Sequence, residues 1–561
     1  MKNLLLVIFP FIMFNFFWNN KILAQEPKFL VDTITRVVDA TLPPYNQIQP
    51  GDTLYFRAGM RDYLLLRNFT GTPEKPVILM NFKGVVSIQT DHYFGILFEN
   101  SRYFRFTGTG DTGYFYGFMV CHVTNGAGLS LGKLSSDYEV DHISIEDVPI
   151  GGIYAKTDPD CSLTATRDKF TQFNTVFHDN YISGSGNEGM YIGSTKYSGQ
   201  TVNCNGKDTL LLPSLLNGVR IYNNIIRYSG WDGIQVSSAY NNCQVYDNIV
   251  IYDSQAEYFS QMSGILLGGG SKCDCYNNYI SEGKGDGIES HGLGGTRIFN
   301  NIILNAGRTF QPTDPKQMKH GIFISDVSTL PDSSYFILFN DIINPKSDGI
   351  RFSSTRSKNN LLSSNVIINP GNFDYYENGG TSYKGKDSYI MLTDTAIKAL
   401  ITNNFFRRNA DSAGFSSGYT LLPISPLIDA GYFNNKGIFF DFYHRMRPYG
   451  NGFDIGAHEF NPAYLGISGH RDRSNDDIVL YPNPVRDSFS IRYNIAKRSV
   501  VILDIFNLQG NKIETHDLGL LENGIHADSF NVMLLRNGVY LYILHIGNQY
   551  HSGKFIKVGR R

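Results

Sequence analysis

The phrase Tyr222-Asn-Asn-Ile-Ile226 recurs along the chain, as Tyr246-Asp-Asn-Ile-Val250 and again as Phe299-Asn-Asn-Ile-Ile303. The third position of the copies forms a column: Asn180, Asn224, Asn248, Asn278, Asn301, Asp341, Asn365 and Asn404. Its shortest spacings are 23 and 24 residues, and the longer ones are this unit plus an insertion. A repeat of this length predicts a protein in which each unit stacks on the one before it.

A second phrase lies inside each unit, where a polar residue precedes Gly and an aliphatic residue. It begins at Glu188, Asp232, Ser263, Asp286, His320 and Asp348. Short alternations of β-branched and aromatic residues, such as Val219–Tyr222, lie between the turn signals and predict strands, whereas no long helical period occurs. Three short strands in 23–24 residues predict one coil of a parallel β-helix, an all-β solenoid. We expect the Asn column to be structural, because an Asn tolerates a left-handed turn and its amide can bond the next Asn.

These repeats resemble the right-handed parallel β-helix proteins of the pectate-lyase-like superfamily, in which stacked Asn residues at a turn are characteristic. Upstream, Gln49–Gly59 and Gly71–Ile78 resemble the first coils of secreted members. Downstream, Ser425–Gly431 and Asp454–Phe460 resemble the "choice-of-anchor Q" segment that ends many bacterial β-helix proteins. We expect that segment to cap the open end of the stack, because repeat arrays need a cap.

The C-terminal stretch resembles the type A sorting domain of the type IX secretion system. The resemblance rests on Tyr481-Pro-Asn-Pro484, on the alternating strand Phe489–Tyr493 and on Asn537-Gly-Val-Tyr540, in that order. It implies a small antiparallel β-sandwich. It also implies contact with the type IX machinery, passage across the outer membrane of a Gram-negative cell, and then release or attachment at the cell surface.

The N terminus predicts a secretory signal peptide. Lys2 precedes an apolar run from Leu4 to Trp18, and a cleavage site follows Ala24. The sequence therefore predicts five parts: a leader over 1–24, the β-helix over 25–424, the cap over 425–460, a linker over 461–477 and the sorting domain over 478–561.

Composition narrows the class of function. The 561 residues carry 49 Lys and Arg against 51 Asp and Glu, and aromatic residues make up 14%. So many aromatic residues argue against bulk disorder, and the balanced charge argues against a polycationic nucleic-acid binder. We expect an exported monomer.

Export permits disulfides. Cys243 and Cys273 each lie five residues before their column Asn, so they fall on consecutive coils, about 4.8 Å apart. They could form a disulfide or a stack of reduced thiols. Cys161 and Cys204 flank irregular segments and could also pair.

Three insertions, at 253–262, 307–319 and 370–386, fall between the Asn strand and the Gly strand, so they should project from one edge. Their aromatic and cationic side chains suit an acidic polysaccharide, although the aromatics could instead pack down on the stack. Together with Glu188, the predicted substrate-binding residues are Tyr258, Phe310, Lys319, Tyr375, Tyr376 and Lys386.

The same edge leads into the predicted catalytic residues: Asp232, Asp286, Glu289, His291, His320 and Arg351. Glu188 and Asp232 on adjacent coils would suit a retaining glycosidase, and Asp232 with Asp286, or Asp286 with Asp348, an inverting one. A lyase needs a cation for a uronate and a base for its α-proton, which Arg351 with Lys319 or His320, or His291 beside Glu289, could provide. Asp-Gly is also ordinary turn chemistry.

Two functions follow, and the sequence leaves both open. The first is a secreted enzyme acting on polysaccharide, either a lyase or a glycoside hydrolase. The second is a non-catalytic adhesin or glycan-binding protein of the cell surface. No metal ligands and no cofactor are predicted, and calcium is left open.

Overall fold

The computed structural model describes residues 26–557 apart from 312–316, 372–374, 379–380, 385–388, 417–418, 463–478, 482–484, 496, 508–511 and 548. The predicted leader and almost all of the predicted linker lie outside these residues. No helix in the described ranges is long and apolar enough to cross a membrane.

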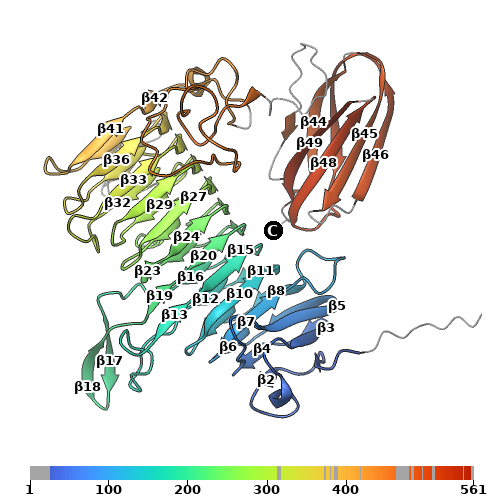
Figure 1. Cartoon of the computed structure of the whole chain (residues 1–561), viewed down its shortest axis with the longest axis vertical. Coiled ribbons are helices and arrows are strands. Elements are labelled where there is room, and N and C mark those ends of the chain that lie inside the picture. The colour runs from blue at the N-terminus through green and yellow to red at the C-terminus, as the bar shows by residue number, and fades with distance from the viewer. Residues whose placement is uncertain are drawn as a thin grey trace, which may run out of the picture.

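Most of the chain winds into a stack of coils, and each coil contributes a strand to three parallel rows (Figure 1). We call the row before the Asn turn sheet A, the row after it sheet B, and the row that follows each Gly sheet C. The long strands β3 (Thr53–Arg61) and β5 (Val77–Thr90) run through both sheet A and sheet B and join them. This is the right-handed parallel β-helix that the repeats predict.

The strands of sheet C are β2 (Val37–Asp39), β4 (Leu64–Arg67), β6 (Phe94–Glu99), β9 (Ala127–Gly132), β12 (Ile153–Ala155), β16 (Met190–Ile192), β22 (Ile234–Val236), β26 (Ser263–Leu267), β29 (Asp286–Ser290), β32 (Ile322–Ile324), β35 (Ile350–Phe352) and β40 (Ile390–Leu392). Sheet A continues from β5 through β7 (Arg102–Thr107), β10 (Ser136–Asp141), β14 (Thr175–His178), β20 (Arg220–Tyr222), β24 (Cys243–Tyr246), β27 (Cys273–Tyr276), β30 (Thr296–Phe299), β33 (Tyr335–Leu338), β36 (Asn360–Ser363) and β41 (Ala399–Thr402). Sheet B continues from β5 through β8 (Phe118–Val123), β11 (Ile143–Val148), β15 (Tyr181–Ser185), β21 (Ile225–Arg227), β25 (Ile249–Ile251), β28 (Tyr279–Ser281), β31 (Ile302–Leu304), β34 (Asp341–Ile343), β37 (Val366–Ile368) and β42 (Phe405–Arg407).

Alternate residues of each strand point inward and form one continuous apolar core along the stack. Ile221 of sheet A, Ile226 of sheet B and Ile234 of sheet C are all fully buried in it. The intervening residues face outward, so residues that share a register position form columns up the outer faces.

A hydrogen-bonded Asn ladder runs along the turn between sheets A and B. The amide of Asn224 donates to Oδ1 of Asn248 at 3.0 Å, and that of Asn248 donates to Asn278 at the same distance. The two middle polar residues of the repeated phrase have different roles. The first of them adopts the left-handed conformation, as Asn223 does at φ 54°, and the second forms the ladder, as Asn224 does.

One member of the predicted column is wrong. Asn340, not Asp341, continues the ladder, because its Oδ1 accepts from the amide of Asn301 at 2.9 Å. Asp341 instead begins β34, in register with Ile302. The left-handed position that an Asn or Asp usually fills is taken here by Phe339, at φ 56°.

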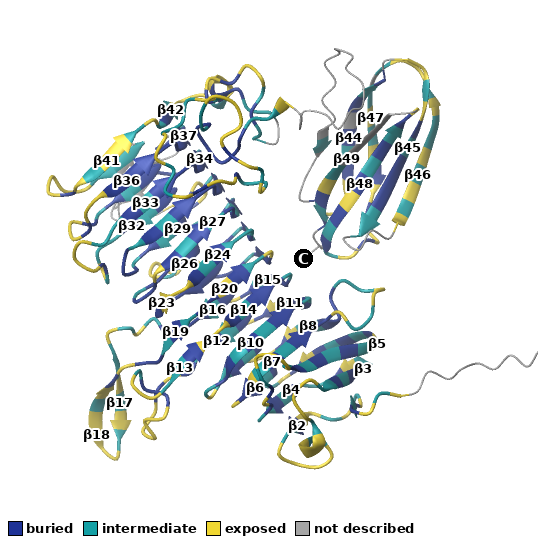
Figure 2. Cartoon of the chain, viewed as in Figure 1, coloured by how far each residue is buried: buried dark blue, intermediate teal, exposed yellow. Residues whose placement is uncertain are grey.

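The three predicted insertions do connect sheet B to sheet C, and the last of them contains a hairpin of β38 (Tyr375–Asn378) and β39 (Thr381–Lys384). A further insertion, between sheets C and A, was not predicted from the sequence. It holds the exposed hairpin of β17 (Gln200–Cys204) and β18 (Lys207–Leu211), beside a short sheet of β13 (Thr171–Phe173), β19 (Leu215–Asn217) and β23 (Ala239–Asn241) (Figure 2). Disulfides join Cys161 to Cys204 and Cys243 to Cys273, the second between neighbouring coils.

The segment predicted as an end cap packs on the side of the stack. Leu427, Ile455 and Ala457 share an apolar cluster with outward residues of sheet B, among them Ile302. By contrast Ile401, in register with the core residue Leu362, is 39% exposed. The described residues thus leave the end of the stack open, because the segment's apolar side chains find partners on the flank.

The C-terminal part is an antiparallel β-sandwich with its own core. One sheet holds β43 (Val479–Tyr481), β44 (Ser488–Ile495) and β47 (Gly524–Asn531). The other holds β46 (Lys512–Leu521), β45 (Ser499–Asn507), β48 (Gly538–Ile546) and β49 (Gln549–Lys557).

Candidate functional site

All six predicted catalytic residues lie on the outward side of sheet C, within five successive coils. One outward column follows the strand register through Gln235, Leu266, Glu289, Phe323 and Arg351. A second column consists of the residues that precede each Gly, which are Glu188, Asp232, Ser263, Asp286, His320 and Asp348. The repeat therefore does bring these side chains to one face, as predicted.

Several side chains of this outward face are buried, and two of them, Lys319 and Asp286, form an ion pair. Nζ of Lys319 donates to Oδ2 of Asp286 at 3.1 Å and to the carbonyl oxygen of Met262 at 3.2 Å. Burial raises the pKa of Asp286 to about 7, although the charge of Lys319 opposes this. Burial works against the charge of Lys319, but Asp286 and Glu289 outweigh it and raise the pKa of Lys319. Lys319 is thus a fixed cation rather than a base.

The carboxylates predicted for a glycosidase are also buried. Glu188 accepts a hydrogen bond from the hydroxyl of Tyr154 at 3.0 Å, and burial raises its pKa. Asp232 is fully buried, and its two oxygens and both polar atoms of Gln235 have no hydrogen-bond partner among the described residues. Burial, followed by the charges of Glu289 and Glu188, raises the pKa of Asp232 well above its ordinary value. Asp232 and Gln235 thus bury polar atoms that no described residue bonds, and such buried atoms are the usual partners of ordered water.

Beside this covered part, Glu289 and His291 form a partly exposed pair. Nε2 of His291 lies 2.6 Å from Oε1 of Glu289, whose other oxygen accepts from the hydroxyl of Ser263 at 2.7 Å. The side chain of His291 is 31% exposed. Burial alone would lower the pKa of His291, but the hydrogen bond and the charge of Glu289 raise it. The contact with Glu289 uses Nε2 of His291, so Nδ1 is the imidazole nitrogen that a substrate could meet.

Arg351 lies two strands further along the same column. Its guanidinium is 3.0 Å from the carboxylate of Asp348 and 37% exposed. Phe323 occupies the strand between Glu289 and Arg351 and meets the ring of His291 edge-on at 6.4 Å. The exposed part of sheet C therefore offers an imidazole, an aromatic ring and a guanidinium in sequence.

His320 is buried below this surface. Its Nδ1 accepts a hydrogen bond from the backbone N–H of Asp348 at 3.2 Å. Burial, with the charges of Arg351 and Lys319, lowers its pKa well below the ordinary value, so the ring is neutral. His320 and Arg351 contact the same carboxylate, that of Asp348, at 3.3 and 3.0 Å.

The predicted substrate-binding residues other than Glu188 and Lys319 fall into three groups. Tyr258 is 52% exposed and stacks on Trp231, with ring centroids 4.7 Å apart and planes 15° apart. Phe310 is only 5% exposed and packs into the stack, so its predicted contact with substrate is not supported. Tyr375, Tyr376 and Lys386 lie outside the residues whose side chains are described. Trp231 was missed because it lies in a regular coil and not in an insertion.

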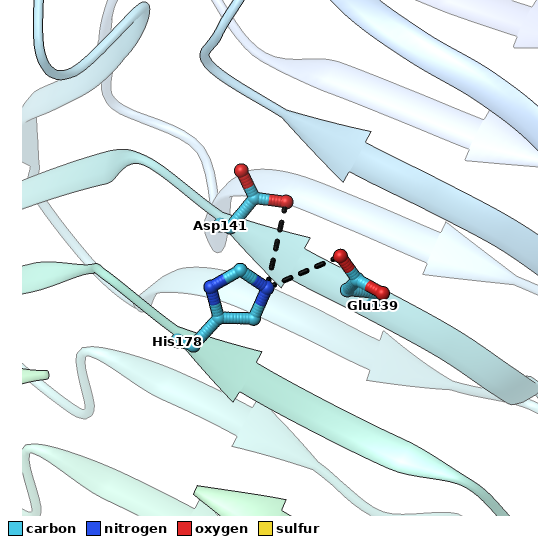
Figure 3. Close-up of side chains that lie close together, drawn as sticks. All are labelled: Glu139, Asp141 and His178. Atoms are coloured by element: carbon cyan, nitrogen blue, oxygen red, sulfur yellow. Dashed lines mark hydrogen bonds and ion pairs between the residues drawn. The ribbon is translucent and has the colours of Figure 1, made fainter. Parts of the chain in front are cut away.

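A second cluster, on sheet A, has the composition of a metal site. Glu139, Asp141 and His178 offer ligand atoms within 4.8 Å of one another (Figure 3). However, Nε of Arg105 donates to Oδ2 of Asp141 at 2.8 Å and lies 3.0 Å from Oε1 of Glu139, and Nδ1 of His178 is 2.6 Å from Asp179. The candidate ligand atoms are thus engaged by neighbouring side chains, Arg105 on the two carboxylates and Asp179 on the imidazole, so we read the cluster as a structural charge network.

The network predicts an alkaline loss of stability. Burial alone would lower the pKa of His178, but hydrogen bonds to Asp179 and Glu139 raise it to about 9 from 6.5. A raised pKa stabilises the fold fully below the unfolded value and loses that effect as pH rises through about 9. We expect roughly 2–3 kcal/mol of stability to disappear between pH 6 and pH 10. In His178→Phe, which keeps the ring stacked on Tyr222, urea unfolding should lack this part of the pH dependence; an unchanged profile would contradict the assignment.

Comparison with known families assigns the two parts of the chain. Residues 213–406 match the family described as the right handed beta helix region, and residues 479–558 match the secretion system C-terminal sorting domain. The chain is a right-handed β-helix protein with a C-terminal sorting domain. The sorting domain marks this β-helix protein for secretion or for the cell surface of a Gram-negative bacterium.

Several solved structures resemble this β-helix protein at a distance. The pectate lyase Pel9A is 12% identical, with a TM-score of 0.36, and the match covers 74% of this chain and 90% of that one. An alginate lyase from Paenibacillus sp. is 12% identical, with a TM-score of 0.33, over 55% and 93% of the two chains. A PL6 family polysaccharide lyase from Pseudopedobacter saltans is 12% identical, with a TM-score of 0.32, over 68% and 92%. These likenesses concern the fold alone. No match was found among the curated proteins.

Proposed function

We propose that the protein is a secreted polysaccharide lyase that cleaves uronate-containing chains at the exposed part of sheet C. One observation carries the proposal: the side chains of His291, which Glu289 holds, and of Arg351 are partly exposed on the outward side of sheet C, whereas the carboxylates needed by a hydrolase are buried. A hydrolase needs two carboxyl groups that reach the glycosidic bond, and Asp232 and Asp286 do not reach solvent.

In the proposed reaction, Arg351 neutralises the carboxylate of a uronate and makes the proton on its neighbouring carbon more acidic. Neutral His291, held by Glu289, takes that proton at Nδ1. A double bond forms between C4 and C5 while the bond from C4 to the glycosidic oxygen breaks, and the departing oxygen takes a proton from water. Arg351 starts about 9.6 Å from Glu289 at the backbone, a gap that its long side chain can cross above Phe323.

The test is a screen of the purified chain against polysaccharides with and without uronates. We expect ultraviolet absorbance from an unsaturated product on at least one uronate-containing chain and none on neutral chains. New reducing ends without absorbance would replace the lyase with a hydrolase. No product on any polysaccharide would leave the glycan-binding protein as the function.

The stacked pair of Trp231 and Tyr258 is proposed as the platform that holds the sugar chain beside this site. Trp231 covers one face of the Tyr258 ring, and the ring remains half exposed. An aromatic face can pack against the C–H groups of a sugar ring. The same platform is the feature that would serve a non-catalytic binder.

The platform carries its own reporter, because Trp231 and Trp18 are the two tryptophans and Trp18 lies in the predicted leader. Titration of the His291→Ala variant with a uronate oligosaccharide should change the fluorescence of Trp231. Tyr258→Ala should weaken binding up to about tenfold, the effect of one aromatic contact. Tyr240→Ala removes an exposed tyrosine elsewhere and is the matched control. An equal response from both variants would remove Tyr258 from the site.

A further inference from the structure

The flank of sheet B carries an apolar patch that the sorting domain covers. Tyr116, Tyr181 and Ile225 face outward from the β-helix, yet each is at most 5% exposed. They form a cluster of their own, against which Phe115 and Ile249 of the β-helix and Ile556 of β49 pack. Figure 1 shows the sorting domain beside this part of the stack. Burial of outward aromatic side chains indicates a contact stronger than a chance encounter of two tethered domains.

Cations of the sorting domain add a second kind of contact. The guanidinium of Arg536 lies 3.6 Å from the ring centroid of Tyr114, in the segment that precedes β8. The guanidinium of Arg486 lies over the ring of Tyr228 at 5.7 Å and also bonds its hydroxyl. In both contacts the cation belongs to the sorting domain and the ring to the β-helix. Such pairs are electrostatically favourable, and more so when water is excluded.

We infer that the sorting domain is a docked partner of its own β-helix, and that it stays bound without a covalent connection. The partner surface is the aromatic flank of sheet B, and the ligand is the cationic edge of the sandwich. None of these contacts involves sheet C, so the proposed lyase site stays open while the sorting domain is bound. The inference therefore does not depend on the proposed function.

The experiment cuts the connection and asks whether the two parts separate. A specific protease site is introduced within residues 463–478 of the full chain, and the folded protein is cleaved and passed over a gel-filtration column. We expect both fragments to elute together at the position of the uncut protein and to separate in denaturant. Two native peaks, one for each fragment, would overturn the inference.

Variants on the two sides of the interface test the assigned contacts. We expect the double variant Arg486→Ala, Arg536→Ala to bind the β-helix roughly tenfold or more weakly after cleavage. Tyr114→Leu removes a ring from the opposite side and should act in the same direction, which guards against misfolding of either part. Arg498→Ala is the matched control, because Arg498 pairs with Glu522 inside the sorting domain. Co-elution that both the double variant and Tyr114→Leu leave unchanged would refute the cation–aromatic contacts.

Discussion

Replacing His291 by alanine is expected to slow formation of the unsaturated product by roughly 10²–10⁴-fold, the usual contribution of a general base. The imidazole is the proposed acceptor of the uronate proton, and it is oriented by a 2.6 Å contact with Glu289. Because the pKa of His291 is raised, the rate should increase with pH through a value above the ordinary 6.5. The measurement is the initial rate of absorbance increase over a range of pH.

Two companion variants separate catalysis from structure. His122→Ala removes an exposed histidine on sheet B and should leave the rate unchanged. Glu289→Gln keeps the shape but removes the negative charge, so the pKa of His291 should fall and the rising limb should move to lower pH. A His291→Ala variant with the activity of the parent protein would remove His291 from the reaction.

Replacing Asn248 by alanine is expected to cost about 3 kcal/mol or more of folding stability, because several buried polar groups lose their partners together. The Asn248 amide donates to the carbonyl of Ile221 at 2.9 Å and to Asn278 at 3.0 Å. Its oxygen accepts the backbone N–H of Asn224 at 3.1 Å and the Asn224 amide at 3.0 Å. The side chain is fully buried, so water cannot replace these bonds.

Urea unfolding measures this loss, with Asn241→Ala as the control, since Asn241 is exposed at the end of β23. Asn248→Asp sharpens the test, because a carboxylate can accept the bonds from Asn224 but cannot donate to Ile221. We expect it to be nearly as damaging as alanine. Equal midpoints for the Asn248 and Asn241 variants would show that the ladder does not support the stack.

The sequence predicted the β-helix because its period, turn residues and strand pattern agree with one another in each coil. It placed Asp341 wrongly for a physical reason. The ladder register is set by which aliphatic side chains enter the core, and Ile342 takes the place of Ile303 there. Asn340-Asp341 looks like the Asn-Asn pair of the repeated phrase, but it lies one residue further along the chain than the equivalent pair. The equivalent left-handed position is held by Phe339, a residue that the sequence pattern does not suggest there.

The candidate site was predicted in outline, but its accessibility was not. Register alone places Asp286 and Glu289 on the same outward face. Whether each side chain reaches solvent depends on the insertions that fold over them, as the contact of Lys319 with Met262 illustrates. The charge network of Glu139, Asp141 and His178 was missed because β10 belongs to a coil that lacks the repeated phrase.

The two disulfides can form only in an oxidising compartment, so the fold is completed outside the cytoplasm. One bond joins successive coils through Cys243 and Cys273, and the other links two surface insertions through Cys161 and Cys204. Both pairs would remain thiols in the reducing interior where the chain is made. The middle of the stack can therefore acquire its final cross-links only after the chain leaves the cytoplasm.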